Sequence, residues 1–367
     1  MRVGAMVRQV CRSCRAVVHA KRFEAVMAVA EGLIRAGRAV PAAMGRSLRS
    51  RTTAKHGIKR VDRLLANPRL YAEHGTFFGA IAARALTGDE RPIVIVDWTQ
   101  VVGHRALVAA VPIGGRALPI YAEVHPEKLL GNSKVQSQFL KALQAVLPGG
   151  CRPIVVTDAG FHGPFFREVT ALGWDFVGRV RGTATVRRHS QRFSKEQIYA
   201  TATPTPRDLG QCQLYSDCRK MFARLVLVRK RRKPGRYIPP PSSKDEREFR
   251  KSARDPWLLA TSLDVDPSTV VAKYSTRMQI EEAFRDAKNH RFGWSLGHVH
   301  TASPPRAQTL LLLASLAMLI VTLVGLSVEA SGGHRAYQAN TAKTRVLSLF
   351  VLGNIVLRRS HQKWGDL

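Results

Sequence analysis

The chain has 367 residues, of which 45% are apolar, and its 58 Lys and Arg against 26 Asp and Glu give a formal net charge of +32. This apolar content excludes a disordered basic tail, and the length predicts two or three domains of roughly 100–200 residues each. Positive charge spread over the whole chain indicates a polyanionic partner, and nucleic acid is the commonest one.

The five cysteines are an odd number in a long chain, which excludes a secreted disulfide scaffold and fits a reducing cytoplasm. Cys11 and Cys14 have the spacing of half a zinc site. Because no second pair follows at a usual distance, free thiols are the favoured interpretation. The N-terminus carries positive charge without a long apolar segment, which argues against a secretory signal.

Residues 1–75 are predicted to be helical and basic. Phe23–Ile34 has helical apolar spacing, and a cluster of cations follows it: Arg46, Arg49, Arg51, Lys55, Lys59, Arg60 and Arg63. Such a cluster is either a solvated helix face or a module that binds phosphates, since Lys and Arg release counterions when they bind DNA. The net charge favours a helical DNA-binding domain over residues 1–75, with Lys59, Arg60 and Arg63 among its contacts.

An α/β pattern begins after this helical region. The apolar run 92–96 ends in Asp97 and predicts a buried strand, and the similar run 153–157 ends in Asp158. The other predicted elements are strands over 106–112 and 116–124 joined by Gly114-Gly115, a helix over 133–147 and a strand over 175–180. This is the element order of a ribonuclease H-like core, although other α/β domains begin in the same way.

The pattern is interrupted over residues 181–256, which hold a basic run, three consecutive prolines and one predicted strand over 222–228. We interpret this segment as a basic, β-rich insertion in the α/β core. Strand character resumes at Trp257, and Ser268 to Lys288 is predicted to be one long helix. The expected parts are 1–75 (helical, DNA-binding), 76–180 (first part of the core), 181–256 (insertion), 257–330 (second part of the core) and 331–367 (C-terminal helical region).

One segment raises the question of a membrane. Residues 307–328 contain no charged side chain and are long enough to span a bilayer. Five polar residues interrupt the segment, and it stands alone in an otherwise basic, soluble pattern. We therefore favour a buried core helix that packs against the sheet behind Glu281, and no membrane partner.

The two aspartates that follow apolar runs are candidates for metal chemistry. Adjacent strands would bring Asp97 and Asp158 together, and two carboxylates in contact need a cation to remain charged. Mg²⁺ accepts one or two carboxylates together with water and phosphate oxygens. The alternative is structural, since Asp is also common after a strand as a turn former or helix cap.

A polar stripe on the predicted helix 268–288 adds a third carboxylate. At about 100° per residue, Arg277, Glu281 and Lys288 lie roughly −60°, −20° and −40° from Tyr274. This stripe is either a salt-bridged solvent face or a face that holds a metal carboxylate between phosphate-binding groups. Glu282 points about 100° away from Glu281 and provides an internal control.

The spacing Tyr274-x2-Arg277-x3-Glu281-x6-Lys288 resembles the signature of bacterial insertion-sequence transposases of the insertion-sequence-four family. The likeness extends over about residues 50–360. Further segments that agree are Lys55–Leu65, Val96-Asp-Trp98, Thr157–Phe161, Gly173-Trp-Asp175, Arg179–Gly182, Gln338–Thr341 and Val346–Phe350.

This resemblance implies a ribonuclease H-like fold and a DNA transposase with an Asp, Asp, Glu triad. Asp97, Asp158 and Glu281 would be catalytic and would hold two Mg²⁺ ions, for which Mn²⁺ can substitute. The resemblance further implies that Tyr274, Arg277 and Lys288 bind transposon-end phosphates. Trp257 would stack on a flipped base during hairpin formation, or else pack in the core.

The family mechanism implies cleavage at the transposon ends, a hairpin intermediate, hairpin opening and strand transfer into target DNA. The implied partners are double-stranded DNA, both terminal inverted repeats and target, and a second copy of the chain as a homodimer on DNA. The expected location is the bacterial cytoplasm, in association with the nucleoid. The chain ends soon after Gln362, earlier than relatives do, so the C-terminal region is expected to be truncated. The alternatives are a ribonuclease H-like nuclease and a truncated, non-catalytic protein that binds transposon ends.

Overall fold

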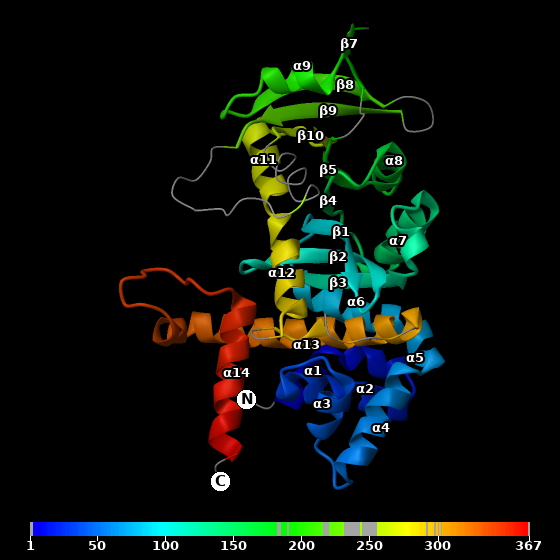
Figure 1. Cartoon of the computed structure of the whole chain (residues 1–367), viewed down its shortest axis with the longest axis vertical. Helices are drawn as coiled ribbons and strands as arrows, with labels where there is room; N and C mark the ends of the chain where they lie inside the picture. Colours follow the sequence, from blue (N-terminus) through cyan, green and yellow to red (C-terminus); the bar gives the residue numbers. More distant parts are fainter. Residues whose placement is uncertain are drawn as a thin grey trace. The chain divides into compact units, whose positions relative to one another are not determined.

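The computed structural model is a mixed α/β protein, so the α/β part of the expected fold class is confirmed (Figure 1). It describes residues 3–181, 185–188, 191–215, 220–230, 243, 255–290, 293–296, 299, 301 and 303–365. The chain divides into two compact units, of which the first combines Met1–Cys151 with Met278–Leu367 and the second is Arg152–Arg277. The five functional parts expected from the sequence remain predictions, because this division is one of packing alone.

The first unit contains most of the helices and one antiparallel ribbon of strands. Its N-terminal elements are α1 (Val3–Val10), η1 (Arg12–Ala16), α2 (Ala20–Ala36), α3 (Pro41–Arg46), α4 (Ala54–Leu65), α5 (Pro68–Ala72) and α6 (His74–Ala85). There follow β1 (Ile93–Val101), β2 (His104–Ile113), β3 (Arg116–His125), η2 (Glu127–Leu129) and α7 (Ser133–Val146). The C-terminal elements are α12 (Met278–Lys288), α13 (Pro304–Ala330), η5 (Gly333–Tyr337) and α14 (Leu349–Gly365).

The second unit is built mainly of strands. Its elements are β4 (Ile154–Thr157), α8 (Gly163–Ala171), β5 (Asp175–Arg179), β6 (Val186–Arg188), β7 (Gln191–Phe193), α9 (Lys195–Ala200), β8 (Arg207–Leu214), β9 (Met221–Val228), β10 (Trp257–Thr261) and α11 (Pro267–Ser275). Their strand order is β4-β5-β10-β9-β8-β6-β7. The predicted strands at 153–157, 175–180, 222–228 and 257–262 are confirmed by β4, β5, β9 and β10.

The ribbon of the first unit has the order β3-β2-β1 and is antiparallel throughout. Gly114 and Gly115 join β2 to β3 with φ values of 56° and 92°, so the predicted hairpin is confirmed. Two consecutive positive φ angles are the geometry that lets a two-residue turn follow the twist of its strands.

The prediction that Asp97 follows the end of a strand is wrong. β1 continues to Val101, and Asp97 lies in its middle, opposite Val108 of β2. The strand is longer than its apolar run because β2 supplies backbone partners as far as His104, and these partners do not depend on side-chain polarity.

The apolar segment 307–328 lies inside α13. Within the described residues, α13 is the one helix long and apolar enough to cross a membrane, and 78% of its most apolar window is buried inside the protein. It packs against α14, β3, α2 and α6 of the first unit. This packing agrees with the core-helix interpretation, since a helix that is apolar all round needs neighbours on every side.

Gln308, one of the polar residues that interrupt this helix, caps the edge of the ribbon. Its side chain is 1% exposed. Oε1 accepts the N–H of Val124 at 2.7 Å, and Nε2 donates to the carbonyl of Ala122 at 2.6 Å. The amide therefore takes the place of a further strand and satisfies one N–H and one C=O on the free edge of β3.

We expect Gln308→Leu to destabilise the protein by about 2–4 kcal/mol, because it leaves two buried backbone groups of β3 without partners. Ser315→Ala is the matched control, since the Ser315 hydroxyl bonds only to the Leu311 carbonyl within its own helix. Its effect should stay within about 1 kcal/mol. Urea unfolding measures both variants, and equal losses would contradict the edge-capping role.

The C-terminal helix α14 crosses α13 at two glycines. A Cβ on Gly325 would overlap the backbone carbonyl of Leu349, and a Cβ on Gly353 would overlap that of Val321. The two helix backbones therefore approach more closely than any larger side chain permits. Phe350 and Leu352 of α14 are buried beside this crossing, so the first turn of α14 contributes to the core of the first unit.

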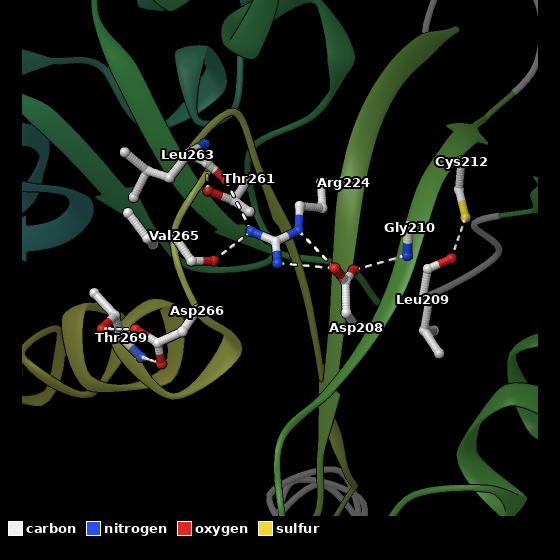
Figure 2. A network of polar contacts seen from close by, with 10 residues as sticks. All are labelled: Asp208, Leu209, Gly210, Cys212, Arg224, Thr261, Leu263, Val265, Asp266 and Thr269. Carbon is white, nitrogen blue, oxygen red and sulfur yellow. Dashed lines mark hydrogen bonds and ion pairs between the residues drawn. The ribbon is translucent and has the colours of Figure 1, made fainter.

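In the second unit, an arginine fixes the loop that leads into α11 (Figure 2). The Arg224 guanidinium donates from Nε and Nη2 to Asp208, at 2.9 and 2.8 Å, and from Nη1 to the carbonyls of Leu263 and Val265. Asp208 also accepts the N–H of Gly210 at 2.7 Å. These bonds join the β8–β9 pair of the insertion to the segment between β10 and α11.

The single helix predicted over 268–288 is wrong, because the chain forms two helices, α11 and α12. The Ser275 hydroxyl donates to the Val271 carbonyl at 2.8 Å, and the Thr276 hydroxyl donates to the Lys273 carbonyl at 2.7 Å. Hydroxyls that bond back in this way compete with the helical ladder. The N–H groups of Thr276 and Arg277 then bond three residues back instead of four, which ends α11.

Candidate active site

In the first unit, α12 brings Glu281 and Lys288 to the strand that carries Asp97. α12 packs against β1, β2 and β3, and Glu281 and Lys288 lie seven residues apart, which places them about 20° apart around the helix. Asp97, Glu281 and Lys288 are all half-buried. Within this unit, the predicted common face of Glu281 and Lys288 is therefore preserved.

Lys288 anchors the end of α12 to β1. Its Nζ donates to the Thr99 hydroxyl at 2.9 Å. Thr99 lies two residues beyond Asp97 and therefore on the same face of the strand. Burial lowers the pKa of Lys288, as does Arg105, whereas the negative charge of Asp97 opposes this effect. The Lys288 ammonium is thus electrostatically coupled to the Asp97 carboxylate. It also holds the end of α12 on β1, in addition to the phosphate contact predicted for it.

A second bridge holds the same turn of α12. Arg116, the first residue of β3, donates from Nε to Asp286 at 2.7 Å. Glu282, by contrast, pairs with Arg285 on the helix surface at 2.9 Å. Helical spacing turns Glu281 about 100° away from Glu282 and this surface pair.

In the second unit, Asp158 directly follows β4, as predicted. Its Oδ1 accepts the N–H of Gly160 at 2.8 Å, so it does form a turn. This bond orients the carboxylate. Asp158 is also close enough to Tyr274 for its charge to act on the phenol, which means that this unit brings two of the predicted site residues together.

Tyr274 and Trp257 form a buried aromatic pair. Their ring centroids lie 4.7 Å apart with an interplanar angle of 77°, and the two residues are 3% and 7% exposed. The Lys230 ammonium lies 4.1 Å from the centre of the Trp257 ring. Burial raises the pKa of Tyr274, whereas Arg277 and Arg179 oppose this effect. Trp257 is therefore packed in the core, which is one of the two roles considered for it from the sequence.

Arg179 is a residue that the sequence did not single out for a role. It is 8% exposed, and burial lowers its pKa, with smaller contributions from Arg181 and Arg277. Its Nη2 donates to the Asp255 carbonyl at 3.2 Å, and in the described part of the chain it makes no ion pair with a carboxylate. A buried guanidinium beside other cations is typical of an anion site. Arg179 lies at the end of β5, opposite Leu259 of β10. The sequence gives no indication of this position, because it follows from the pairing of two strands that are far apart in the chain.

The predicted DNA contacts near the N-terminus lie on α4 of the first unit. Lys59, Arg60 and Arg63 are all exposed. α4 packs against α3, where Gly45 and Gly57 leave room for the two backbones to touch. The predicted site residues therefore lie on β1 and α12 of the first unit, on β4, β10 and α11 of the second unit or next to them, and on the exposed face of α4.

The donor chemistry of the three acidic residues fits a hard divalent cation, because carboxylate oxygens are the ligands that Mg²⁺ prefers. Asp97 and Glu281 belong to the first unit, and Asp158 belongs to the second. Among the described residues, no group of three or more His, Cys, Asp or Glu side chains is gathered closely enough to hold a metal ion. The triad as a three-residue site therefore stays a prediction.

Carboxylates that could hold divalent cations, in a strongly basic α/β chain, are compatible with an enzyme that acts on nucleic-acid phosphodiesters. The chain matches the model of the transposase DDE domain over residues 88–320, more than half of its length, and belongs to this family. It is thus a DDE transposase, a polynucleotidyl transferase and endonuclease with DNA as substrate. Such enzymes generally use divalent metal ions. A search of curated proteins finds no match.

Proposed function

We propose that this transposase cuts an insertion sequence out of DNA and transfers it into a target by a cut-and-paste route with a hairpin intermediate. The observation that carries the proposal is the family match, whose span contains Asp97, Asp158 and Glu281. The Tyr274-to-Lys288 signature further supports membership of the insertion-sequence-four family. Within that family, the motifs most resemble those of the member that flanks the tetracycline-resistance composite transposon.

The three carboxylates have the catalytic role in this proposal, on a ribonuclease H-like core with its β-rich insertion at 181–256. Asp97, Asp158 and Glu281 would hold two Mg²⁺ ions, or Mn²⁺ in their place. Bound ions of this kind activate water or a 3′-hydroxyl and stabilise the leaving oxygen of a phosphoryl transfer. Asp158 is oriented for this task by its bond to Gly160. Lys288 keeps the end of α12 on β1 through Thr99.

The cationic and aromatic residues bind the DNA end. Tyr274 and Arg277 contact end phosphates, and Arg179 adds a third group to them, because a phosphate relieves the repulsion between the buried guanidinium of Arg179 and its half-buried neighbour Arg277. Lys288 binds a phosphate when DNA displaces its bond to Thr99. Trp257 accepts a flipped base on its ring face, where Lys230 lies in the free protein.

The assembly expected for this chemistry is a homodimer that holds two terminal inverted repeats and then the target DNA. The proposed location is the bacterial cytoplasm, at the nucleoid. Lys59, Arg60 and Arg63 of the N-terminal helices contribute DNA contacts to this assembly.

Cleavage of the labelled end of the element in Mg²⁺ tests the proposal, with Asp97→Ala as the decisive variant. The wild type should produce a 3′-hydroxyl at the repeat boundary, followed by a hairpin band, and the variant should lose about a thousandfold or more of this activity. Asp89→Ala is the control, since Asp89 is an exposed turn residue outside β1 that bonds the Arg91 N–H. It should cleave like the wild type.

The alternatives give different results in the same assay. A structure-selective nuclease would cut unrelated DNA as readily as the repeat, and a truncated end-binding protein would bind the repeat without cutting it in Mg²⁺ or Mn²⁺. Either result would contradict the proposal, as would equal activity of Asp97→Ala and Asp89→Ala.

A further inference from the structure

A hollow in the helical part of the first unit has five Lys or Arg side chains among its nine lining residues. It lies between α2, α4 and α5 and has a volume of about 340 Å³. Its lining residues are His19, Lys21, Arg22, Ala25, Arg60, Arg63, Leu64, Asn67 and Arg69. Of the predicted DNA contacts, Arg60 and Arg63 face this hollow and Lys59 does not line it.

Most of this charge is uncompensated. Arg22 pairs with Glu73, to which its Nε donates at 2.6 Å. Lys21, Arg60, Arg63 and Arg69 are exposed, and none of them forms an ion pair with any described carboxylate. Four like charges that converge on one hollow repel each other, and a bound anion removes this repulsion.

The hydrogen-bond donors available to a ligand in this hollow are side chains, because the nearby backbone N–H groups are already bonded. The N–H of Lys21 is already bonded to the His19 side chain, and the N–H groups of Arg69 and Leu70 are bonded to the Asn67 side chain. The guanidinium groups that remain can bind a phosphate through two parallel hydrogen bonds each.

The walls of the hollow are fixed by contacts outside it. The Gly45–Gly57 contact holds α4 against α3, and a Cβ at either position would overlap the facing backbone. Asp62, on the exposed face of α4, pairs with Arg306 of α13 at 2.5 Å. The Arg22–Glu73 pair joins α2 to the residue that follows α5. The cations are therefore presented from three helices whose positions are set before any ligand binds.

The exposed surface of α4 has two sectors. At about 100° per residue, Lys55 and Lys59 lie within roughly 40° of each other, whereas Arg60 lies about 100° beyond Lys59 and faces the hollow. The positive surface thus continues from the hollow along the length of α4. An extended row of cations of this kind fits a polymer with regularly spaced phosphates better than a single small anion.

We propose that this hollow seats the sugar–phosphate backbone of one strand of duplex DNA, and that the Lys55–Lys59 sector of α4 then faces the adjacent groove. The inference rests on the proposed function and adds that different residues bind the phosphates and read the bases. Arg60, Arg63, Lys21 and Arg69 supply affinity that is independent of sequence, because phosphate contacts carry no sequence information. Lys55 and Lys59 then lie where base edges are read.

The salt dependence of binding to a duplex of unrelated sequence tests this proposal in the full chain. Arg60→Gln and Arg69→Gln should each reduce the slope of log K against log salt by about 0.9 and weaken binding about five- to tenfold at low salt. Arg60→Lys keeps the charge and should retain the slope. Arg84→Gln, which removes an exposed cation from the last turn of α6 outside the hollow, is the matched control.

The outcomes separate this inference from the proposed function. If the wild type binds and cleaves the end but Arg60→Gln and Arg69→Gln behave like Arg84→Gln, the hollow is not a phosphate site and the transposase proposal stands. If the wild type neither binds DNA nor cleaves it, both are overturned. The midpoint of thermal unfolding of each variant should equal that of the wild type. Any loss of DNA affinity then comes from the missing DNA contact and not from unfolding.

Discussion

Replacing Glu281 with Gln should reduce cleavage of the transposon end by about a thousandfold or more, with end binding within about twofold of the wild type. The substitution keeps the shape of the side chain and removes only its charge. Glu281 lies on the half-buried face of α12 with Lys288, toward the strand of Asp97. In the proposed triad this carboxylate acts on the chemistry, whereas the side chains proposed to bind DNA are cationic or aromatic. End-labelled cleavage and gel-shift titration measure the two effects.

Glu282→Gln is the matched control, since it makes the same substitution one residue along the same helix. Its carboxylate pairs with exposed Arg285, and such surface pairs contribute little to stability. Cleavage should remain within about threefold of the wild type. Equal losses in the two variants would contradict the assignment of Glu281.

Replacing Gly325 with Ala should destabilise the protein by about 3 kcal/mol. The added Cβ meets the backbone carbonyl of Leu349, which cannot rotate away as a side chain could. Either α14 separates from α13 or both helices deform. Chemical unfolding followed by circular dichroism measures the loss of stability, and limited proteolysis shows whether α14 is released.

Gly79→Ala is the matched control, because the same substitution should not destabilise the protein at this position. Gly79 also lies within a helix, α6, but a Cβ there would lie 3.8 Å from the Val146 carbonyl, an ordinary contact. Because alanine is the better helix former, this variant should gain up to about 1 kcal/mol. A comparable loss at both positions would show that the helix crossing at Gly325 and Gly353 has no special role.

Local patterns predicted most of the elements near the site correctly. The apolar run before Asp158 forms β4, the glycine pair 114–115 forms the hairpin, and the spacing over 133–147 forms α7. These features depend on residues close together in the chain, namely β-branched runs, positive-φ glycines and helical periodicity. The same locality explains why Glu281 and Lys288 were correctly placed on one face.

Local patterns failed where a side chain or a partner strand decided the outcome. The hydroxyls of Ser275 and Thr276 end α11, although the periodicity runs on to Lys288. β1 extends through Asp97 because β2 lies beside it. In both cases a hydrogen bond that the apolar pattern does not encode determined where the element ends.

The sequence by itself determined the basic character and the α/β class, and it supplied the acidic and cationic residues that are proposed as the site of this DDE transposase. Only the tertiary structure joined Gln308 to the edge of β3, Lys288 to Thr99 and Arg179 to Tyr274, since these partners are far apart in the chain. It likewise gathered Lys21, Arg60 and Arg69 from three helices into one hollow. Composition and short-range spacing are carried by neighbouring residues, whereas burial, hydrogen bonding and the convergence of charge depend on how distant segments pack.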